Sequence, residues 1–361
     1  MSATFGERLR VTVFGQSHSE AMGAVVDGLP AGLRIDTERL RAFLARRAPG
    51  QGPLTTARRE PDAPEIIAGL ADGVTCGAPL CILIRNTDAR SRDYETLRRV
   101  VRPSHADYPA YVRFGGHNDI RGGGQFSGRL TAPLCAAGAV ALQCLAARGV
   151  GVYAHIASIA GIKDAAVDPL SPDLPALAAL AAKPLPVLDA RAGEAMAQAV
   201  CDAAADGDSV GGVVECVVTG LPAGVGEPLY DSVESRLAAL LFAVPAVKGV
   251  EFGAGFAAAA LRGSENNDGY TASGGEVRTL SNHSGGICGG LTTGMPVVFR
   301  AAFKPTPSIA RPQRTVALPG PEVTTLTVGG RHDPCVVPRA VPVVEAAAAL
   351  TMYDLLLCAA L

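Results

Sequence analysis

The sequence lacks the cysteine patterns that mark disulfide-stabilised and zinc-binding proteins. Its nine cysteines are scattered, with no Cys-x-x-Cys pair and no His/Cys cluster at zinc-ligand spacing. Such a distribution argues against a disulfide scaffold and a structural metal site, and it indicates reduced thiols in a cytoplasm. No apolar run approaches the roughly 20 residues that cross a membrane, and residues 1–10 lack the apolar core of a signal peptide. We therefore expect a cytoplasmic protein with no bound metal and no membrane anchor.

Charge of either sign is also scarce. Charged residues make up 18% of the chain and the formal net charge is −2, so the overall charge does not favour binding to nucleic acid or an anionic membrane. Lysine occurs only at Lys163, Lys183, Lys248 and Lys304. Most of the positive charge is therefore arginine, whose planar guanidinium binds phosphate and carboxylate groups with two hydrogen bonds. A biased genome composition would explain the number of arginines equally well, but not where they cluster.

The chain is long and apolar enough to form a large core, with 361 residues of which 48% are hydrophobic. No Ser/Gly-rich or Pro-rich linker divides it, so we expect one domain spanning residues 1–361. Helix-forming residues behind capping residues predict helices, and clusters of β-branched residues predict strands. The predicted helices are residues 36–47, 131–147, 190–205, 230–243 and 341–361. The predicted strands are residues 10–14, 24–27, 80–85, 213–219 and 296–302.

One segment occurs twice in the chain. Residues 25–32 read Val-Val-Asp-Gly-Leu-Pro-Ala-Gly, and residues 217–224 read Val-Val-Thr-Gly-Leu-Pro-Ala-Gly. In both cases an acidic residue and an amphipathic helix follow, which indicates two related strand-turn-helix halves. Such halves would pack as sheet, helix and sheet layers around one core, so the predicted fold class is α+β, a β-α-β sandwich rather than an open parallel sheet. The alternative is chance reuse of a favourable turn.

Several glycine-rich stretches carry polar side chains suited to chemistry. Residues 14–18 place Ser17 and His18 on a loop at the end of a strand, a position typical of catalysis, although a lone histidine is more often structural. Residues 102–108 lead into the loop 121–129, whose glycines let backbone N–H groups approach an anion beside a helix N-terminus. Neither a Walker lysine nor a GxGxxG turn after a strand is present, so a nucleotide-binding or nucleic-acid-binding module is disfavoured.

Two more stretches of this kind, residues 281–290 and 330–335, supply further histidines and an aspartate. Arginines accompany them. Arg47 precedes a Pro-Gly turn, and Arg339 stands at the entrance of the C-terminal helix. For Arg46, a solvent-exposed side chain that complements the dipole at a helix end is as good an interpretation as an anion ligand. Together these residues predict an anion-binding, glycine-walled pocket served by histidine and aspartate.

These stretches, in this order, resemble the chorismate synthase family over nearly the whole chain. The Gly-Glu-Ser-His-Gly motif of the family appears as residues 15–19, its Arg-Pro-x-His-Ala-Asp-Tyr motif as residues 102–108, and its Arg-Gly-Gly-Gly loop as residues 121–124. The remaining matches are residues 244–251, 281–290, 304–308 and 330–335. The resemblance implies a lyase of the shikimate pathway, which removes phosphate and a C6 hydrogen from 5-enolpyruvylshikimate 3-phosphate (EPSP) by anti 1,4-elimination to give chorismate, with reduced FMN.

The resemblance also implies roles for individual residues. His18 is expected to protonate the departing phosphate, and His105 to lie beside the N1 region of the flavin. Asp333 would assist proton removal near N5, and Ser17 and Ser127 would orient protons. The residues expected to bind substrate are Arg47, Arg129 and Arg339, whose charge would stabilise the leaving phosphate. The residues expected to contact FMN are Gln125, Phe126, Ser127, Pro245, Ala246, Gly289, Lys304, Pro305, Thr306, Pro307, Ser308 and Arg331.

Two further expectations concern partners. Members of the family are usually homotetramers, which the resemblance implies here as well. No reductase domain or long insertion is visible in the sequence, so we expect an external flavin reductase to supply FMNH2 rather than NAD(P)H oxidation by the protein itself.

The sequence departs from the family pattern at a few positions within these motifs. Gln16 stands where an acidic residue is usual, and Ser19 where a glycine is usual. Gln125 and Phe126 replace an arginine and a serine after the triple glycine. Pro53 replaces an arginine, which leaves open an anion contact and any nicotinamide-nucleotide contact there. The alternative hypothesis is therefore a catalytically impaired flavin-binding paralogue with the same fold.

Overall fold

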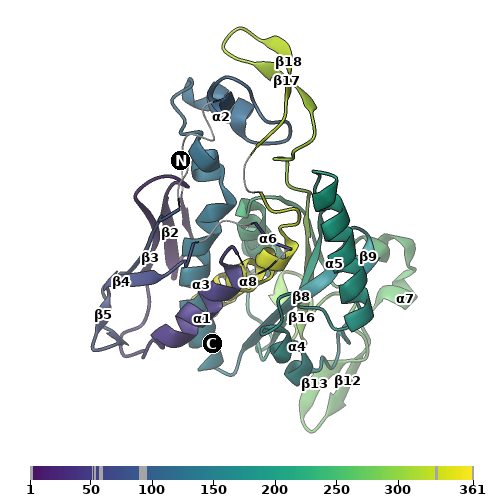
Figure 1. Ribbon diagram of the computed structural model, residues 1–361. Helices are drawn as coiled ribbons and strands as arrows, with labels where there is room; N and C mark the ends of the chain where they lie inside the picture. The colour runs from purple at the N-terminus through teal and green to yellow at the C-terminus, as the bar shows by residue number, and fades with distance from the viewer. Residues whose placement is uncertain are drawn as a thin grey trace.

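Two antiparallel sheets enclose a layer of helices in the computed structural model, which describes residues 3–50, 52, 54–56, 60–88, 96–329 and 332–359 (Figure 1). The first sheet has the strand order β1 (Thr4–Phe5), β2 (Arg10–Gly15), β3 (Ala21–Asp27), β7 (Leu80–Arg85) and β4 (Pro64–Ala68). The second has the order β11 (Val247–Phe252), β16 (Val297–Phe303), β10 (Gly212–Thr219), β8 (Gly151–Ile159) and β9 (Ile162–Lys163). The predicted α+β sheet-helix-sheet fold is confirmed.

The middle layer consists of α1 (Thr37–Arg47), α3 (Thr131–Ala146), α6 (Val233–Ala243) and α8 (Val337–Cys358). Alanine is frequent in α3 and α8, and their small side chains let the two helices approach closely. At Gly138, an added Cβ would lie only 2.3 Å from the Cβ of Ala346. By length and composition Gly128–Ala146 and Val337–Cys358 could cross a membrane, but 72% and 89% of their apolar windows are buried, as expected for core helices.

Two buried carboxylates on α8 hold the layers together. Glu345 accepts hydrogen bonds of 2.6 and 3.0 Å from the two terminal nitrogens of Arg46 on α1, and it also accepts one from a backbone N–H of β8. Asp354 accepts three backbone N–H groups of the segment before β2 and pairs with Arg236 of α6 at 2.5 Å. Arg46 therefore serves the core packing, since it is paired and does not line the pocket described below.

The two copies of the repeated turn make the same contacts. The Thr75 hydroxyl donates a hydrogen bond to the Pro30 carbonyl at 2.7 Å. It also accepts one from the backbone N–H of Leu33, three residues after Pro30, at 2.9 Å. Thr292 does the same in the second copy, with Pro222 at 2.6 Å and Val225 N–H at 2.9 Å. The strand orders β2-β3-β7-β4 and β8-β10-β16-β11 also correspond. We propose that duplication of one unit within a single domain produced these two halves.

Most local predictions agree with the structure. All five predicted helices and all five predicted strands are present, and the helix predicted at residues 190–205 is α5 (Ala190–Ala205). Two helix starts differ: α6 begins at Val233 behind a Ser232 cap, and α8 begins at Val337, before the predicted residue 341. The elements not predicted include β8 and β11, and also α2 (Asp107–Phe114), α4 (Leu174–Leu180), α7 (Gly263–Asn266), β5 (Leu70–Ala71), β6 (Val74–Thr75), β12 (Tyr270–Ser273), β13 (Glu276–Thr279), β14 (Ile287–Cys288), β15 (Leu291–Thr292), β17 (Gln313–Ala317) and β18 (Glu322–Leu326).

Candidate active site

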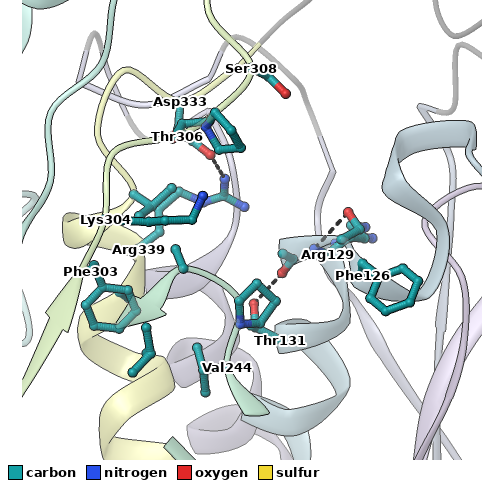
Figure 2. Close-up of a pocket in the computed structure, with 18 of the residues that line it drawn as sticks. Phe126, Arg129, Thr131, Val244, Phe303, Lys304, Thr306, Ser308, Asp333 and Arg339 are labelled. Carbon is teal, nitrogen blue, oxygen red and sulfur yellow. Dashed lines mark hydrogen bonds and ion pairs between the residues drawn. The ribbon is translucent and has the colours of Figure 1, made fainter. Parts of the chain in front are cut away.

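A pocket of about 510 Å³ opens where α3 and α8 begin and α1 and α6 end. Its volume is typical of pockets that bind small molecules or cofactors. Figure 2 shows Lys304, Thr306 and Asp333 on one side of the pocket and Phe126 and Arg129 on the other. The sequence-predicted residues that line the pocket are His105, Gln125, Phe126, Ser127, Pro245, Ala246, Lys304, Thr306, Pro307, Ser308, Arg47, Arg129, Arg339 and Asp333.

Some predicted site residues do not line this pocket. Pro305 is in the same segment as its lining neighbours but does not line the wall itself. Gly289 follows β14, and its neighbour Gly290 contacts Ser232 at the start of α6, whereas the pocket lies at the end of α6. Since α6 has 11 residues, that helix separates Gly289 from the pocket by about 16 Å. Arg331 and Pro53 lie outside the described residues.

The triple-glycine loop lies against both predicted histidines. Gly122 lines the pocket, and a Cβ added to it would lie 2.6 Å from a ring carbon of His18 and 2.4 Å from the Ser17 hydroxyl. A Cβ on Gly123 would lie 3.3 Å from Nε2 of His105. His105 lines the pocket, whereas His18 and Ser17 lie behind Gly122. A side chain at Gly122 would collide with Ser17 and His18, and both glycines have a positive φ that favours glycine.

His105 is held by two neighbours from its own motif. Its Nδ1 lies 2.6 Å from Oδ1 of Asp107, the first residue of α2. Arg102 donates to both carboxylate oxygens of Asp107, at 2.7 and 2.8 Å. Burial disfavours the charged form of Asp107, but the hydrogen bonds from Arg102 and His105 outweigh it and hold the pKa of this carboxyl well below its usual range.

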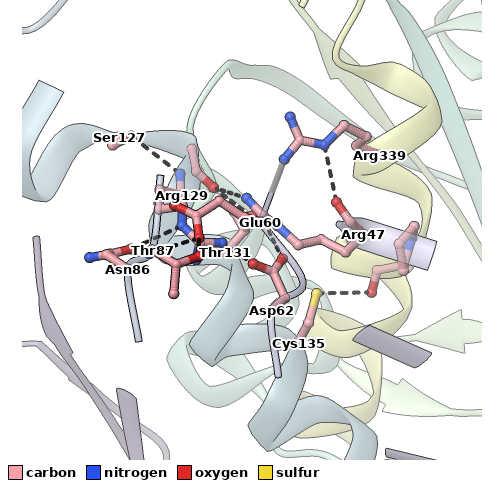
Figure 3. A network of polar contacts seen from close by, with 12 residues as sticks. Arg47, Glu60, Asp62, Asn86, Thr87, Ser127, Arg129, Thr131, Cys135 and Arg339 are labelled. Carbon is pink, nitrogen blue, oxygen red and sulfur yellow. Dashed lines mark hydrogen bonds and ion pairs between the residues drawn. The ribbon is translucent and has the colours of Figure 1, made fainter. Parts of the chain in front are cut away.

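Arg47 and Arg129 converge on a buried carboxylate, Asp62 (Figure 3). Arg47 donates to Asp62 at 2.5 Å, to Thr131 Oγ1 at 3.0 Å and to a backbone carbonyl at 3.0 Å. Arg129 donates to the other oxygen of Asp62, and its second terminal nitrogen lies 3.6 Å from Glu60. Burial opposes ionisation of Asp62, yet the two guanidinium groups keep its pKa below the usual range. The site therefore contains paired arginines, whose positive charge is partly balanced before any ligand binds.

Arg339 and Asp333 form a second ion pair at the pocket wall. Arg339 donates to Asp333 Oδ2 at 2.6 Å and to the backbone carbonyl of Arg47 at 3.0 Å. The other oxygen of Asp333 accepts the Thr56 N–H at 2.9 Å. Burial lowers the pKa of both Arg129 and Arg339, although an arginine remains protonated at neutral pH. The pairing fixes both side chains at the N-terminal end of α8.

The segment after β16 presents donors to the pocket. Lys304 donates to the backbone carbonyl of Ser104 at 2.8 Å, and its pKa is lowered by burial and by nearby Lys248. The Thr306 hydroxyl is buried and lines the pocket, and it has no hydrogen-bond partner among the described residues. Ser308 accepts a long hydrogen bond, 3.4 Å, from Arg102. One ammonium and two hydroxyl groups thus face the same side of the pocket.

Two of the positions that depart from the family pattern, Ser19 and Phe126, have local structural partners. The Ser19 hydroxyl accepts the Gln16 N–H at 2.9 Å and donates to the Ala21 carbonyl at 2.7 Å, which closes the turn before β3. Phe126 packs against Phe114 of α2, with ring centroids 6.4 Å apart. A smaller side chain at position 126 would remove this aromatic contact.

Sequence reasoning missed several residues of the site, namely Glu60, Asp62, Arg102, Asp107 and His332. Arg102 and Asp107 were visible as parts of a motif, and their spacing from His105 was the available signal. His332 also lines the pocket, where burial lowers its pKa and a ring nitrogen lies 3.1 Å from the Gly329 carbonyl. Nothing in the local sequence around Asp62 indicates that two distant arginines meet there. In the described part of the chain, no group of three or more His, Cys, Asp or Glu residues is arranged to hold a metal ion.

Comparisons with known proteins agree on one family. A sequence profile described as chorismate synthase matches residues 9–357. A chorismate synthase of Methanocella arvoryzae is 47% identical over 97% of this chain and 93% of its own length, and one of Aeropyrum pernix is 48% identical over 98% and 92%. A solved crystal structure of chorismate synthase superposes with a TM-score of 0.77 at 27% identity, covering 98% of this chain and 92% of that chain.

Proposed function

The chain belongs to the chorismate synthase family, and we propose that it catalyses the anti 1,4-elimination of phosphate and a C6 hydrogen from EPSP to give chorismate. As a member of this family it is a carbon–oxygen lyase. The observation that carries the proposal is a single pocket lined by two histidines, four arginines and part of the glycine loop. An elimination that releases phosphate needs cations for the leaving group and groups that move protons.

The donors of the 304–308 segment fit the phosphate of FMN. Thr306 offers a buried hydroxyl with no partner in the described part of the chain, and Lys304 adds a positive charge beside it. Ser308 would contribute a second hydroxyl. We propose that these three side chains hold the cofactor phosphate, while Gln125, Phe126, Ser127, Pro245 and Ala246 contact its ring. When bound, reduced FMN supplies the electron density that makes phosphate departure possible.

The arginines would hold the anionic substrate. Arg47, Arg129 and Arg339 reach the pocket from three different helices or their caps, so their charges surround one volume. Their pairing with Asp62 and Asp333 fixes each guanidinium before substrate arrives. Such preorganisation reduces the reorganisation that the reaction would otherwise require.

His105, His18 and Asp333 would handle protons. His105 lines the pocket and its Nε2 lies beside Gly123, a suitable position for a group that contacts the cofactor. His18 would protonate the departing phosphate across Gly122, whose missing side chain leaves that ring close to the pocket. Asp333 would assist removal of the C6 hydrogen, with Ser17 and Ser127 orienting the protons.

The same family membership motivates our proposal of a cytoplasmic homotetramer that receives FMNH2 from an external reductase. Turnover of EPSP by the purified protein with NAD(P)H and FMN alone would contradict the dependence on a reductase. Size measurement by light scattering would test the tetramer.

The decisive experiment is anaerobic turnover of EPSP with dithionite-reduced FMN, monitored by chorismate absorbance and phosphate release. We expect His18→Ala and His105→Ala each to lower kcat by about 100-fold or more, because positioned acid–base groups contribute 10²–10⁴-fold. His117→Ala is the matched control, since His117 is exposed and does not line the pocket. Binding of FMN without turnover in the parent protein would favour the impaired paralogue instead.

A further inference from the structure

One short hydrogen bond joins His105, which lines the pocket, to Asp107, a carboxylate that no proposed role yet uses. Nδ1 of His105 lies 2.6 Å from Oδ1 of Asp107, within the range of strong charge-assisted hydrogen bonds. The same Nδ1 lies 3.1 Å from a terminal nitrogen of Arg102. Because a carboxylate only accepts and a guanidinium only donates, these two contacts make opposite demands on the imidazole proton.

The distances decide between the two arrangements. If Nδ1 carried no proton, its lone pair would face the Asp107 oxygen at 2.6 Å, and two acceptors would repel each other at that separation. If Nδ1 carries the proton, it donates to Asp107. The longer contact with Arg102 is then a close approach of two donors rather than a hydrogen bond. The guanidinium has better acceptors in the two oxygens of Asp107, at 2.7 and 2.8 Å. The proton therefore resides on Nδ1, and in the neutral imidazole Nε2, which lies beside Gly123, is the acceptor.

Asp107 is itself held firmly. Its side chain is only 6% exposed, and the carboxylate accepts from both the side chain and the backbone N–H of Arg102. Arg102 in turn reaches Ser308 in the segment that we propose binds the cofactor phosphate. A histidine oriented by a carboxylate keeps one tautomer and one ring orientation, as in enzymes that use a histidine between a carboxylate and a reacting group.

We propose that Asp107 is a positioning residue that fixes the Nδ1-protonated tautomer of His105 and aims its Nε2 at the bound cofactor and substrate. The aiming step rests on the function proposed above, whereas the tautomer does not. Asp107 touches neither ligand in this arrangement and acts only through His105.

Three other charged or titratable groups lie near His105. Arg102 contacts the ring from the same motif, and His332 lines the pocket from the loop before α8. Lys304 contacts the backbone of the neighbouring Ser104. These two cations and the second imidazole are still present in Asp107→Asn, so a change of tautomer in that variant reports the loss of the carboxylate.

The first test is the tautomer itself, measured by two-bond ¹H–¹⁵N NMR correlation on protein labelled with ¹⁵N-histidine at alkaline pH, where the imidazole is neutral. The chain has six histidines, and loss of one signal set in His105→Ala identifies the set of His105. We expect a protonated Nδ1 and an unprotonated Nε2 in the parent protein, and a shift towards the Nε2-protonated form in Asp107→Asn. A parent protein with Nε2 protonated would overturn the proposal whatever the activity.

The second test is a double-mutant cycle. Asp107→Asn should lower kcat about 100-fold with KM changed by no more than about threefold, and Asp107→Glu should restore part of the loss. In the His105→Ala background the same substitution should cost almost nothing, because the residues act as one unit. Additive losses would contradict action through His105. No turnover in the parent, with the expected tautomer present, would contradict the proposed function and leave the tautomer assignment standing.

The matched control is Asp354→Asn, which also removes a buried carboxylate paired with an arginine, but near the C-terminal end of α8, whereas the pocket lies at its N-terminal end. It should lower thermal stability without moving the His105 signals. A similar shift of those signals in Asp354→Asn would indicate a general structural effect and refute the specific role of Asp107.

Discussion

Replacement of Asp62 by asparagine tests whether the arginines of the pocket depend on one buried carboxylate. The Asp62 side chain is fully buried, and its two oxygens accept separately from Arg47 and Arg129, whose side chains are 3% exposed. Asparagine has nearly the same shape, and it tolerates the positive φ of 49° at this position better than most residues. The substitution therefore removes the charge and leaves the backbone in place.

The expected loss is large because two cations lose their shared anion. Breaking a buried ion pair by removing one partner costs about 3–5 kcal/mol, since the other charge stays buried and unpaired. Asparagine would also point a donor at one of the guanidinium groups, which can only donate. Glu60, 3.6 Å from Arg129, offsets part of the loss. At about 2.1 cal/mol/K of unfolding entropy per residue, the 361-residue chain should lose about 4–7 °C of Tm at pH 7.

The pH dependence provides an independent check. Burial raises the pKa of Asp62, but Arg47 and Arg129 lower it further, so the folded pKa lies below the unfolded value. A depressed carboxyl pKa stabilises the fold above the unfolded pKa of about 3.9, and this contribution is lost as the pH falls through the folded value. The difference in Tm between parent and Asp62→Asn should therefore be full at pH 7 and shrink below about pH 4.

Thermal unfolding followed by circular dichroism measures both quantities. The control is Asp119→Asn, whose partner Arg121 is 41% exposed, so this pair should contribute only about 0–1 kcal/mol. A Tm loss for Asp62→Asn no larger than that of the control would refute the argument that Asp62 is the buried counter-ion. A loss that did not change between pH 7 and pH 3 would show that charge is not its cause.

Two further predictions concern packing and the repeated turn. Gly138→Ala should destabilise the protein by about 1–3 kcal/mol in urea unfolding, because the new Cβ would lie 2.3 Å from that of Ala346. Adding Ala346→Gly to the same chain should recover part of the loss. If stability did not recover, the strain would lie elsewhere. Thr75→Val and Thr292→Val should each cost about 1–3 kcal/mol, because each hydroxyl serves one carbonyl and one N–H group in the same geometry; clearly unequal losses would contradict equivalent turns.

The local sequence predicted secondary structure well where capping residues mark the start of a helix. Asp36 accepts N–H groups at the start of α1, and Asp189 does so at the start of α5, as capping residues were expected to do. The prediction failed for β8, which contains glycine and alanine, and for β11, which contains a glycine beside a charged residue. Those strands form because neighbouring strands pair with them, and pairing partners are not visible within a local window.

The site was predicted unevenly for the same reason. His105, Gln125 and Ser127 lie in or near motifs short enough to recognise, and all three line the pocket. Gly289 also lies in a recognisable motif, but the fold places it near the start of α6, whereas the pocket lies at the end of that helix. Arg47 is predicted to bind the substrate, and the sequence gives no sign that its donors also contact Asp62, Thr131 and a backbone carbonyl.

The sequence by itself determined the family, the layered fold and the positions of most helices and strands, because capping, periodicity and motif residues act within a few positions of each other. The tertiary structure alone decided how charge is arranged in the pocket. Asp62 pairs with Arg47 and with Arg129, 67 positions further along, and Glu345 pairs with Arg46, 299 positions away. Such pairs form only after the core packs, since burial gives these ion pairs their strength and no local pattern records which charges it will bring together.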